Sequence, residues 1–116
     1  MFRNNNKKDE KFFYLLFIIL PFIFFSYFLY SNKLIGFIDA FNQFFPYRYF
    51  LANSVLKGEL PLWWPYTALG YPFIETFQSA VFYPLNYLFV FLYKNNQFLA
   101  YNLGIIFHTI LLLIVS

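Results

Sequence analysis

The sequence predicts an all-α integral membrane protein in which two or three transmembrane helices are joined by a long outer loop. Two observations lead to this prediction. Hydrophobic residues make up 61% of the chain and charged residues only 11%, about half the charged share of a typical soluble domain. In addition, the uncharged apolar stretches 12–30 and 98–116 are each long enough to cross a bilayer. Both observations argue against a water-soluble fold.

Residues 1–11 are predicted to form a cytoplasmic basic tail. Four cations stand immediately before the first apolar stretch: Arg3, Lys7, Lys8 and Lys11. This is the positive-inside pattern, which puts the N-terminus in the cytoplasm and the following loop outside the cell. The net charge of +3 is therefore explained without a nucleic-acid partner.

Residues 12–30 form the first predicted transmembrane helix. At about 1.5 Å of rise per residue, this uncharged stretch matches a hydrocarbon core of about 30 Å. A signal peptide would have a shorter apolar core followed by a cleavage site of small residues. Pro21 lies inside the span, so we expect a kink near it.

Residues 31–97 form the predicted outer loop, which contains five of the six prolines. Short helices and turns are expected there rather than long regular elements. A short amphipathic helix is predicted over 46–57, because Pro46 suits a first helical position and Gly58 suits the position just after a helix end. We expect this helix to lie along the outer membrane interface.

The number of spans depends on the stretch 77–93, which is uncharged but interrupted. We predict an embedded helix over 79–93 at the outer surface, followed by the second transmembrane helix over 98–116. The alternative is a hairpin of two spans that turns at 94–97. Length alone does not decide between them. Because the last apolar run reaches Ser116 without a polar cap, we expect the chain to be a truncated piece of a longer protein.

An ordered set of polar, glycine, proline and aromatic residues runs through the outer loop. Its order is Asp-x-x-x-Gln, Pro, Gly-x-x-Pro-Leu-Trp-x-Pro-Tyr, Gly-x-Pro, Gln-Ser-Ala and Tyr-Pro-x-Asn. The residues are Asp39, Gln43, Pro46, Gly58, Pro61, Leu62, Trp63, Pro65, Tyr66, Gly70, Pro72, Gln78, Ser79, Ala80, Tyr83, Pro84 and Asn86. This set resembles the first outer loop of the bacterial YfhO-type membrane proteins, which belong to the GT-C glycosyltransferase architecture. Trp64 and Glu75 depart from the family pattern.

The resemblance covers the chain from about Phe12 to its end and implies the N-terminal part of a GT-C-like, multi-span fold. The implied activity is transfer of a sugar from a polyprenyl-phosphate carrier to a glycan or lipid of the cell envelope, at the outer face of the cell membrane. In GT-C enzymes an acid in the first outer loop acts as base or metal ligand, and Asp39 is the corresponding residue. The metal would be Mg or Mn. The piece alone would be inactive.

The chemistry itself needs an acid near the acceptor hydroxyl, and positive charge or a metal at the departing phosphate. Asp39 is the candidate catalytic acid and metal ligand, although it can also cap a helix or pair with Lys33. Arg48 is the candidate phosphate contact, although a cation on an interfacial helix commonly extends to lipid headgroups. The other predicted substrate-binding residues are Gln43, Trp63, Tyr66, Gln78 and Asn86.

Each of these other residues has a structural alternative. Gln43 can orient Asp39 from one helical turn away or simply hydrate the interface. The aromatic residues Trp63 and Tyr66 also fit an interfacial aromatic belt. Polar side chains beside Pro84 are what a broken helix requires to satisfy its free backbone groups, which applies to Gln78 and Asn86.

His108 lies within the last apolar stretch, where an ionisable residue raises a functional hypothesis. Its alternative is a neutral histidine packed at a helix contact beside Gly104. The sequence contains no cysteine, zinc motif, glycine-rich phosphate loop or nucleophile elbow, so soluble-enzyme chemistries have no support.

Two further functions remain open from the sequence. One is a complete small membrane protein that binds a partner or a lipid without chemistry. The other is a transporter of a lipid-linked sugar, which would use the broken helix at Pro84 but would not require Asp39.

Overall fold

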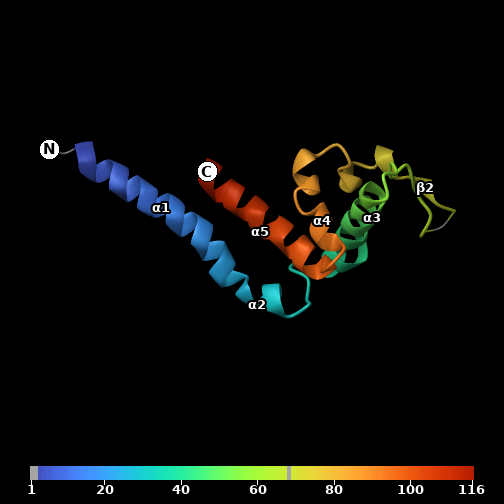
Figure 1. Cartoon of the computed structure of the whole chain (residues 1–116), viewed down its shortest axis with the longest axis horizontal. Coiled ribbons are helices and arrows are strands. Elements are labelled where there is room, and N and C mark those ends of the chain that lie inside the picture. The colour runs from blue at the N-terminus through green and yellow to red at the C-terminus, as the bar shows by residue number, and fades with distance from the viewer. Residues whose placement is uncertain (1–2, 68) are drawn as a thin grey trace.

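The computed structural model describes residues 3–67 and 69–116, and these are predominantly helical. The all-α class is confirmed, since the two strands, β1 (Trp63–Trp64) and β2 (Tyr71–Pro72), have two residues each. The molecule is elongated, with extents of 67 × 29 × 24 Å. One end is the free N-terminal part of α1 and the other is the β1–β2 hairpin (Figure 1).

The first apolar stretch forms two helices instead of one. Helix α1 spans Arg3–Phe24 and α2 spans Ser26–Tyr30. The backbone leaves helical geometry at Phe25, with φ −96° and ψ 10°, one turn after Pro21. The amide of Phe25 still donates to the carbonyl of Pro21 at 2.9 Å. The predicted helix over 12–30 is therefore interrupted near its C-terminal end.

The last apolar stretch forms α5 (Gln97–Val115), which begins where the Asn96 side chain accepts a hydrogen bond from the Leu99 amide at 3.0 Å. In the part of the chain that the structure describes, α5 is the one helix both long and apolar enough to cross a membrane. Helix α1 differs because its first turns carry the charged tail and the helix ends at Phe24, before the apolar stretch ends.

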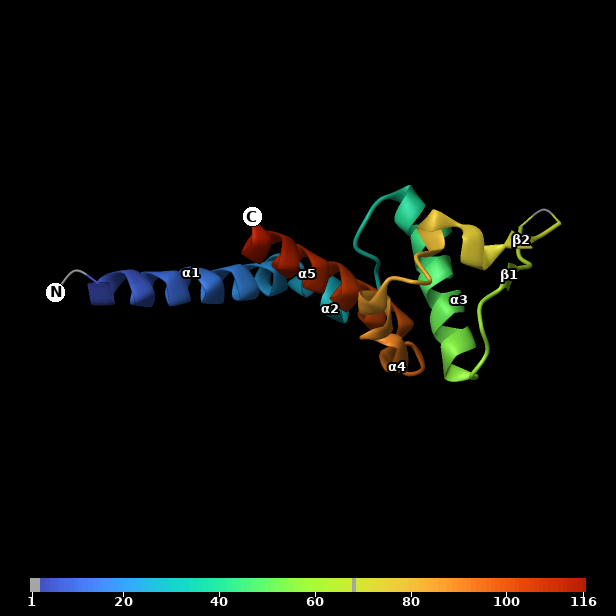
Figure 2. The same ribbon diagram turned by 90° about the horizontal axis from the view of Figure 1, so that it is seen from above.

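Helices α1 and α5 lie side by side and run in opposite directions (Figures 1 and 2). The fully buried Asn102 of α5 fixes the chain segment that follows α2. Its Oδ1 accepts from the Ile35 amide at 2.9 Å, and its Nδ2 donates to the carbonyls of Phe28 at 3.0 Å and Lys33 at 2.7 Å. This amide thereby supplies partners for backbone groups that irregular structure leaves free.

A helix lies where Pro46 and Gly58 predict one. After the π-helical turn η1 (Ala40–Phe44), α3 spans Phe45–Leu56, and the chain leaves it through Gly58 at φ +74°. The buried residues of α3 face two clusters, one against α4 and α5 and one against the hairpin. Helix α3 therefore separates two regions of the molecule, as the view in Figure 2 shows.

The antiparallel hairpin pairs Trp64 with Tyr71. The indole of Trp64 stacks on Phe73 at 5.6 Å between ring centroids and meets Tyr47 and Phe50 edge-on. Such aromatic pairs add roughly 0.5–1.5 kcal/mol each beyond their buried area. The aromatic cluster thus holds a very short sheet against α3.

The segment after the hairpin differs from its prediction. In place of one embedded helix over 79–93, the structure has short 3₁₀ turns and a single α-helical turn: η2 (Phe73–Glu75), η3 (Phe77–Ser79), η4 (Pro84–Tyr87) and α4 (Val90–Tyr93). A continuous helix is prevented because Ala80 is left-handed at φ +46° and Pro84 has no amide hydrogen to donate.

Candidate functional site

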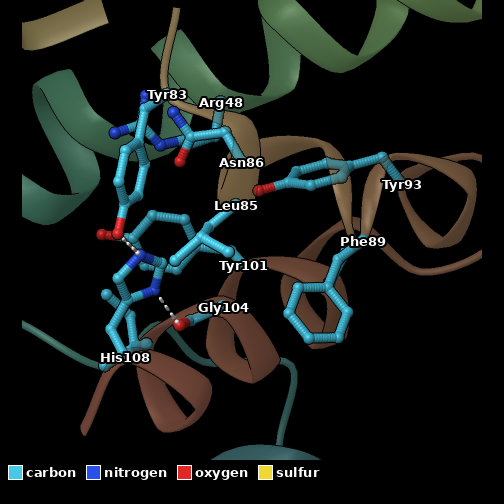
Figure 3. A pocket seen from close by; sticks show the side chains of 11 residues that line it. Arg48, Tyr83, Leu85, Asn86, Phe89, Tyr93, Tyr101, Gly104 and His108 are labelled. Carbon is cyan, nitrogen blue, oxygen red and sulfur yellow. Dashed lines mark hydrogen bonds between the residues drawn. The ribbon is translucent and has the colours of Figure 1, made fainter. Parts of the chain in front are cut away.

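A cavity of about 350 Å³ lies between α3, η4, α4 and α5 (Figure 3). Its walls carry a set of polar and aromatic side chains: Arg48, Tyr83, Asn86, Tyr93, Tyr101 and His108. Two of the site residues that the sequence predicts, Arg48 and Asn86, are therefore brought together here.

Arg48 points inward from α3, and its Nη1 donates to the carbonyl of Ser79 at 2.6 Å. Burial lowers the pKa of Arg48, whereas the nearby Tyr93 and Tyr101 raise it. No aspartate or glutamate of the described residues is among the groups that shift this pKa. Arginine keeps its charge in proteins, so the cavity contains a partly buried cation without a carboxylate partner, an arrangement suited to an anion.

Tyr93 closes the cavity from α4. Burial raises the pKa of Tyr93, with the positive charge of Arg48 opposing this effect. The phenol is therefore neutral at physiological pH and offers an O–H donor. Together with the guanidinium, it makes the cavity rich in hydrogen-bond donors.

His108 joins α5 to the segment before η4. Its Nδ1 lies 2.7 Å from the Gly104 carbonyl, and its Nε2 lies 3.1 Å from the Tyr83 hydroxyl (Figure 3). Because a carbonyl only accepts, Nδ1 is the donor to Gly104. Both ring nitrogens have a hydrogen-bond partner. This geometry agrees with a histidine packed at a helix contact beside Gly104, which is the alternative that the sequence offers.

Asn86 lines the cavity while it also closes a turn. Its Nδ2 donates to the carbonyl of Ala80, the left-handed residue, at 2.7 Å. This is the contact that the structural alternative for Asn86 expects. The amide therefore fixes the wall of the cavity beside Pro84.

The other predicted polar residues lie outside this cavity. Gln43 donates to Gln78 through their side-chain amides on the molecular surface, so two predicted substrate-binding residues contact each other. Asp39 is exposed at the start of η1 and does not line the cavity. Among the described residues, no group of three His, Asp or Glu side chains is placed to hold a metal. A metal on Asp39 would therefore need ligands from outside this set.

Trp63 and Tyr66 line a separate groove of about 770 Å³ between α3 and β1. Both are more than half exposed, at 52% and 71%. The groove and the Arg48 cavity lie on different faces of α3. The structure thus divides the predicted substrate-binding residues between two places.

Sequence reasoning missed Tyr93, Tyr101 and Asn102 as important residues. Tyr101, Gly104 and His108 share the spacing of one helical face, which is the signal that could have placed Tyr101 in a cavity wall. Asn102 and Tyr93 carry no comparable local signal, because their roles depend on contacts with distant segments.

The comparisons with known proteins add no assignment. No protein-family model, no curated protein and no solved structure matches this chain. Any functional interpretation therefore depends on the geometry of the cavity and groove, together with the order of residues in the loop.

Proposed function

We propose that this chain is part of a multi-pass membrane glycosyltransferase of the GT-C type, and that the Arg48 cavity binds the phosphate of a polyprenyl-phosphate-linked sugar. The observation that carries the proposal is the partly buried guanidinium, which faces a cavity with no neighbouring carboxylate among the described residues. Phosphate is one of the two anions, with carboxylate, that the planar donors of arginine match. The loop pattern that resembles YfhO-type proteins supports the same substrate.

A membrane position is supported by the exposed apolar surface of two helices. Besides α5, the stretch of α1 after Lys11 exposes large apolar side chains around its axis, among them Leu15, Ile19 and Ile23. A helix that is apolar on all sides is stable in a bilayer or inside a large core. We therefore place both α1–α2 and α5 in the cell membrane, with the N-terminus in the cytoplasm and the long loop outside.

The two ends of the cavity suit an amphipathic lipid. Arg48 is near Tyr101, which lies one turn, about 6 Å, from the outer end of α5. Apolar side chains continue the wall along α5 and η4: Leu85, Phe89 and Ile105. A phosphate at the guanidinium would thus lie near headgroup depth, with the first isoprenoid units against the apolar wall.

The irregular backbone between Phe77 and Tyr87 indicates that protein, and not lipid, covers this side of the cavity. Its Tyr83 contacts His108, about 16 Å along α5 from Gln97. Non-helical backbone at membrane depth is tolerated only where protein buries it or where it lines a cavity. We infer that further helices of the transferase cover this side, where Phe77 is fully exposed and Phe82 largely so.

Asp39 is the proposed catalytic base or metal ligand, and Gln43 would orient it from one helical turn away. One specific observation favours a second candidate function, binding of the carrier lipid without chemistry. Asp39 lies outside the cavity that Arg48 lines, so catalysis requires the sugar to extend from the cavity toward η1. Binding of the carrier lipid alone does not require the sugar to reach Asp39.

Binding of farnesyl phosphate and of uncharged farnesol to the detergent-solubilised protein tests the proposal. We expect the phosphate to bind at least roughly tenfold more tightly, because hydrogen bonds to a charged group contribute about 1.5–3 kcal/mol. Arg48→Gln should remove this preference. Lys94→Gln, which removes an exposed loop cation, should retain it. Equal affinities for the two ligands in the unaltered protein would contradict the proposal without reference to any variant.

A further inference from the structure

The groove between α3 and β1 is a second site with different chemistry from the Arg48 cavity. Along α3, positions 46, 49, 50, 53 and 57 share one face at about 100° per residue, and Arg48 lies on roughly the opposite face. The groove is lined from the first of these faces and from β1. A ligand in the groove would therefore not contact the guanidinium.

Aromatic rings form much of the apolar part of the groove. Trp63 and Tyr66 come from the β1 side, and Tyr49 comes from α3. Trp63 is exposed yet fixed in place, because its indole packs so closely on Gly70 that a Cβ added there would lie 2.4 Å from Nε1. Rings held in position before binding reduce the entropy lost when a ligand is ordered.

Polar groups alternate with these rings. Asn42 and Asn53 offer amides that both donate and accept hydrogen bonds, and Lys57 and Glu59 contribute one charge of each sign. In addition, the buried Nε1 of Trp64 has no hydrogen-bond partner among the described residues. A buried donor without a partner is unusual in proteins, and Trp64 is one of the residues that line the groove.

We propose that this groove binds an uncharged saccharide chain. Sugar rings present C–H faces to aromatic side chains and hydroxyl edges to groups that can donate or accept, which is the combination found here. The balanced charges of Lys57 and Glu59 favour a neutral chain over an acidic or phosphorylated one. A volume of about 770 Å³ lies within the range of roughly 300–1,000 Å³ typical of ligand sites. A bilayer interface would use the aromatic rings but not the two amides.

In the proposed transferase the bound chain would be the acceptor, but saccharide binding itself does not depend on that function. The test therefore omits any polyprenyl phosphate. The chain has only two tryptophans, and both lie in the groove. Intrinsic fluorescence thus reports directly on occupancy.

Maltohexaose, cellohexaose and chitohexaose serve as neutral probes for the protein in detergent micelles. We expect at least one of them to change the tryptophan emission saturably. Tyr66→Ala should weaken this binding by roughly fivefold or more, from the loss of one aromatic contact. Asn53→Ala should weaken it as well. Tyr30→Ala is the matched control, since Tyr30 is also a largely exposed tyrosine but lies on α2, outside the groove, and it should leave the affinity unchanged.

The proposal is overturned if no hexasaccharide changes the emission, or if Tyr66→Ala leaves the change intact. In either case, quenching of the tryptophans by brominated lipids in vesicles would show that the groove faces the bilayer. Because Tyr66 is 71% exposed, its replacement does not remove a core residue. Near-ultraviolet circular dichroism would verify that the aromatic cluster stays packed.

Discussion

Asn102 and Ile35, separated by 67 residues in sequence, are joined by a 2.9 Å hydrogen bond from the Ile35 amide to the side chain of Asn102. The same side chain donates to two further carbonyls, that of Phe28 within α2 and that of Lys33 in the turn after it. One buried residue of α5 thus supplies the hydrogen bonds of a turn that has no regular structure of its own. The relative position of the first and last helices depends on it.

Asn102→Leu should therefore destabilise the fold strongly. It leaves the Ile35 amide and two carbonyls without partners, and each buried unpaired group costs about 1–3 kcal/mol. We expect the midpoint of thermal unfolding, followed by circular dichroism in detergent, to fall by several degrees. Asn95→Leu is the control, because Asn95 is exposed. Equal midpoints for the two variants would show that water or detergent replaces the lost partners.

Gly70→Ala should distort the hairpin, whereas Gly58→Ala should not. Both glycines have positive φ, +80° and +74°, so alanine costs about 1 kcal/mol at either position. Only at Gly70 does the added Cβ meet other atoms, Trp63 Nε1 at 2.4 Å and the Trp64 carbonyl at 2.9 Å. Near-ultraviolet circular dichroism should thus change for Gly70→Ala alone. Similar spectra for the two variants would mean that Trp63 moves aside freely.

Two substitutions at Gly104 distinguish an effect on the space inside the cavity from an effect on the stability of α5. A Cβ at Gly104 would lie 4.0 Å from Phe89, which is ordinary contact, so Gly104→Ala should preserve farnesyl phosphate binding. It should also raise helix stability by about 0.5–1 kcal/mol. Gly104→Leu extends into the cavity and should weaken binding at least roughly tenfold, since the bound lipid and the added side chain cannot share the space. Unchanged affinity for Gly104→Leu would place the lipid elsewhere.

Local signals predicted part of this fold. Pro46 and Gly58 delimit a helix because each residue acts on its own backbone, and α3 spans Phe45–Leu56. The predicted helix over 79–93 is wrong because an apolar composition does not reveal that Ala80 adopts a left-handed conformation. Pro21 predicted a kink nearby, and the helix breaks at Phe25, one turn after this proline.

The candidate site was less predictable than the helices. Composition and spacing indicated Arg48 as a cation on an interfacial helix, but its inward direction is set by the Ser79 carbonyl, 31 residues away. The sequence also does not show that Trp63 and Arg48, which it grouped as substrate-binding residues, point to different sites. Opposite faces of α3 separate them, and only the three-dimensional structure reveals this.

The proposed topology predicts that Phe37→Cys is labelled from outside the cell. Phe37 is 93% exposed in the segment that follows α2, and the chain has no other cysteine. A membrane-impermeant maleimide should therefore modify it in intact cells. A cysteine introduced at Lys8 should react only after the cells are permeabilised. The opposite pattern would reverse the orientation and remove the outer-face interpretation.

Replacement of Asp39 separates catalysis from carrier binding. If Asp39 is the base or metal ligand, Asp39→Asn should lower sugar transfer by about 10²-fold or more, the usual contribution of general acid–base catalysis. Farnesyl phosphate binding should stay unchanged, because Asp39 does not line the Arg48 cavity. Transfer would be measured with a radiolabelled lipid-linked sugar in membranes that contain the whole transferase of which this chain is proposed to be part.

Glu75→Gln is the matched control for Asp39→Asn, since Glu75 is also an exposed loop acid. Transfer at the normal rate by Asp39→Asn would exclude Asp39 as the catalytic acid, whereas no transfer by the unaltered protein would favour the lipid-binding function. If both variants lost transfer equally, the cause would be the loss of negative charge from the loop rather than a catalytic carboxylate. Loss confined to Asp39→Asn, with carrier binding retained, would connect the exposed turn η1 to the cavity on α3 as two parts of one active site.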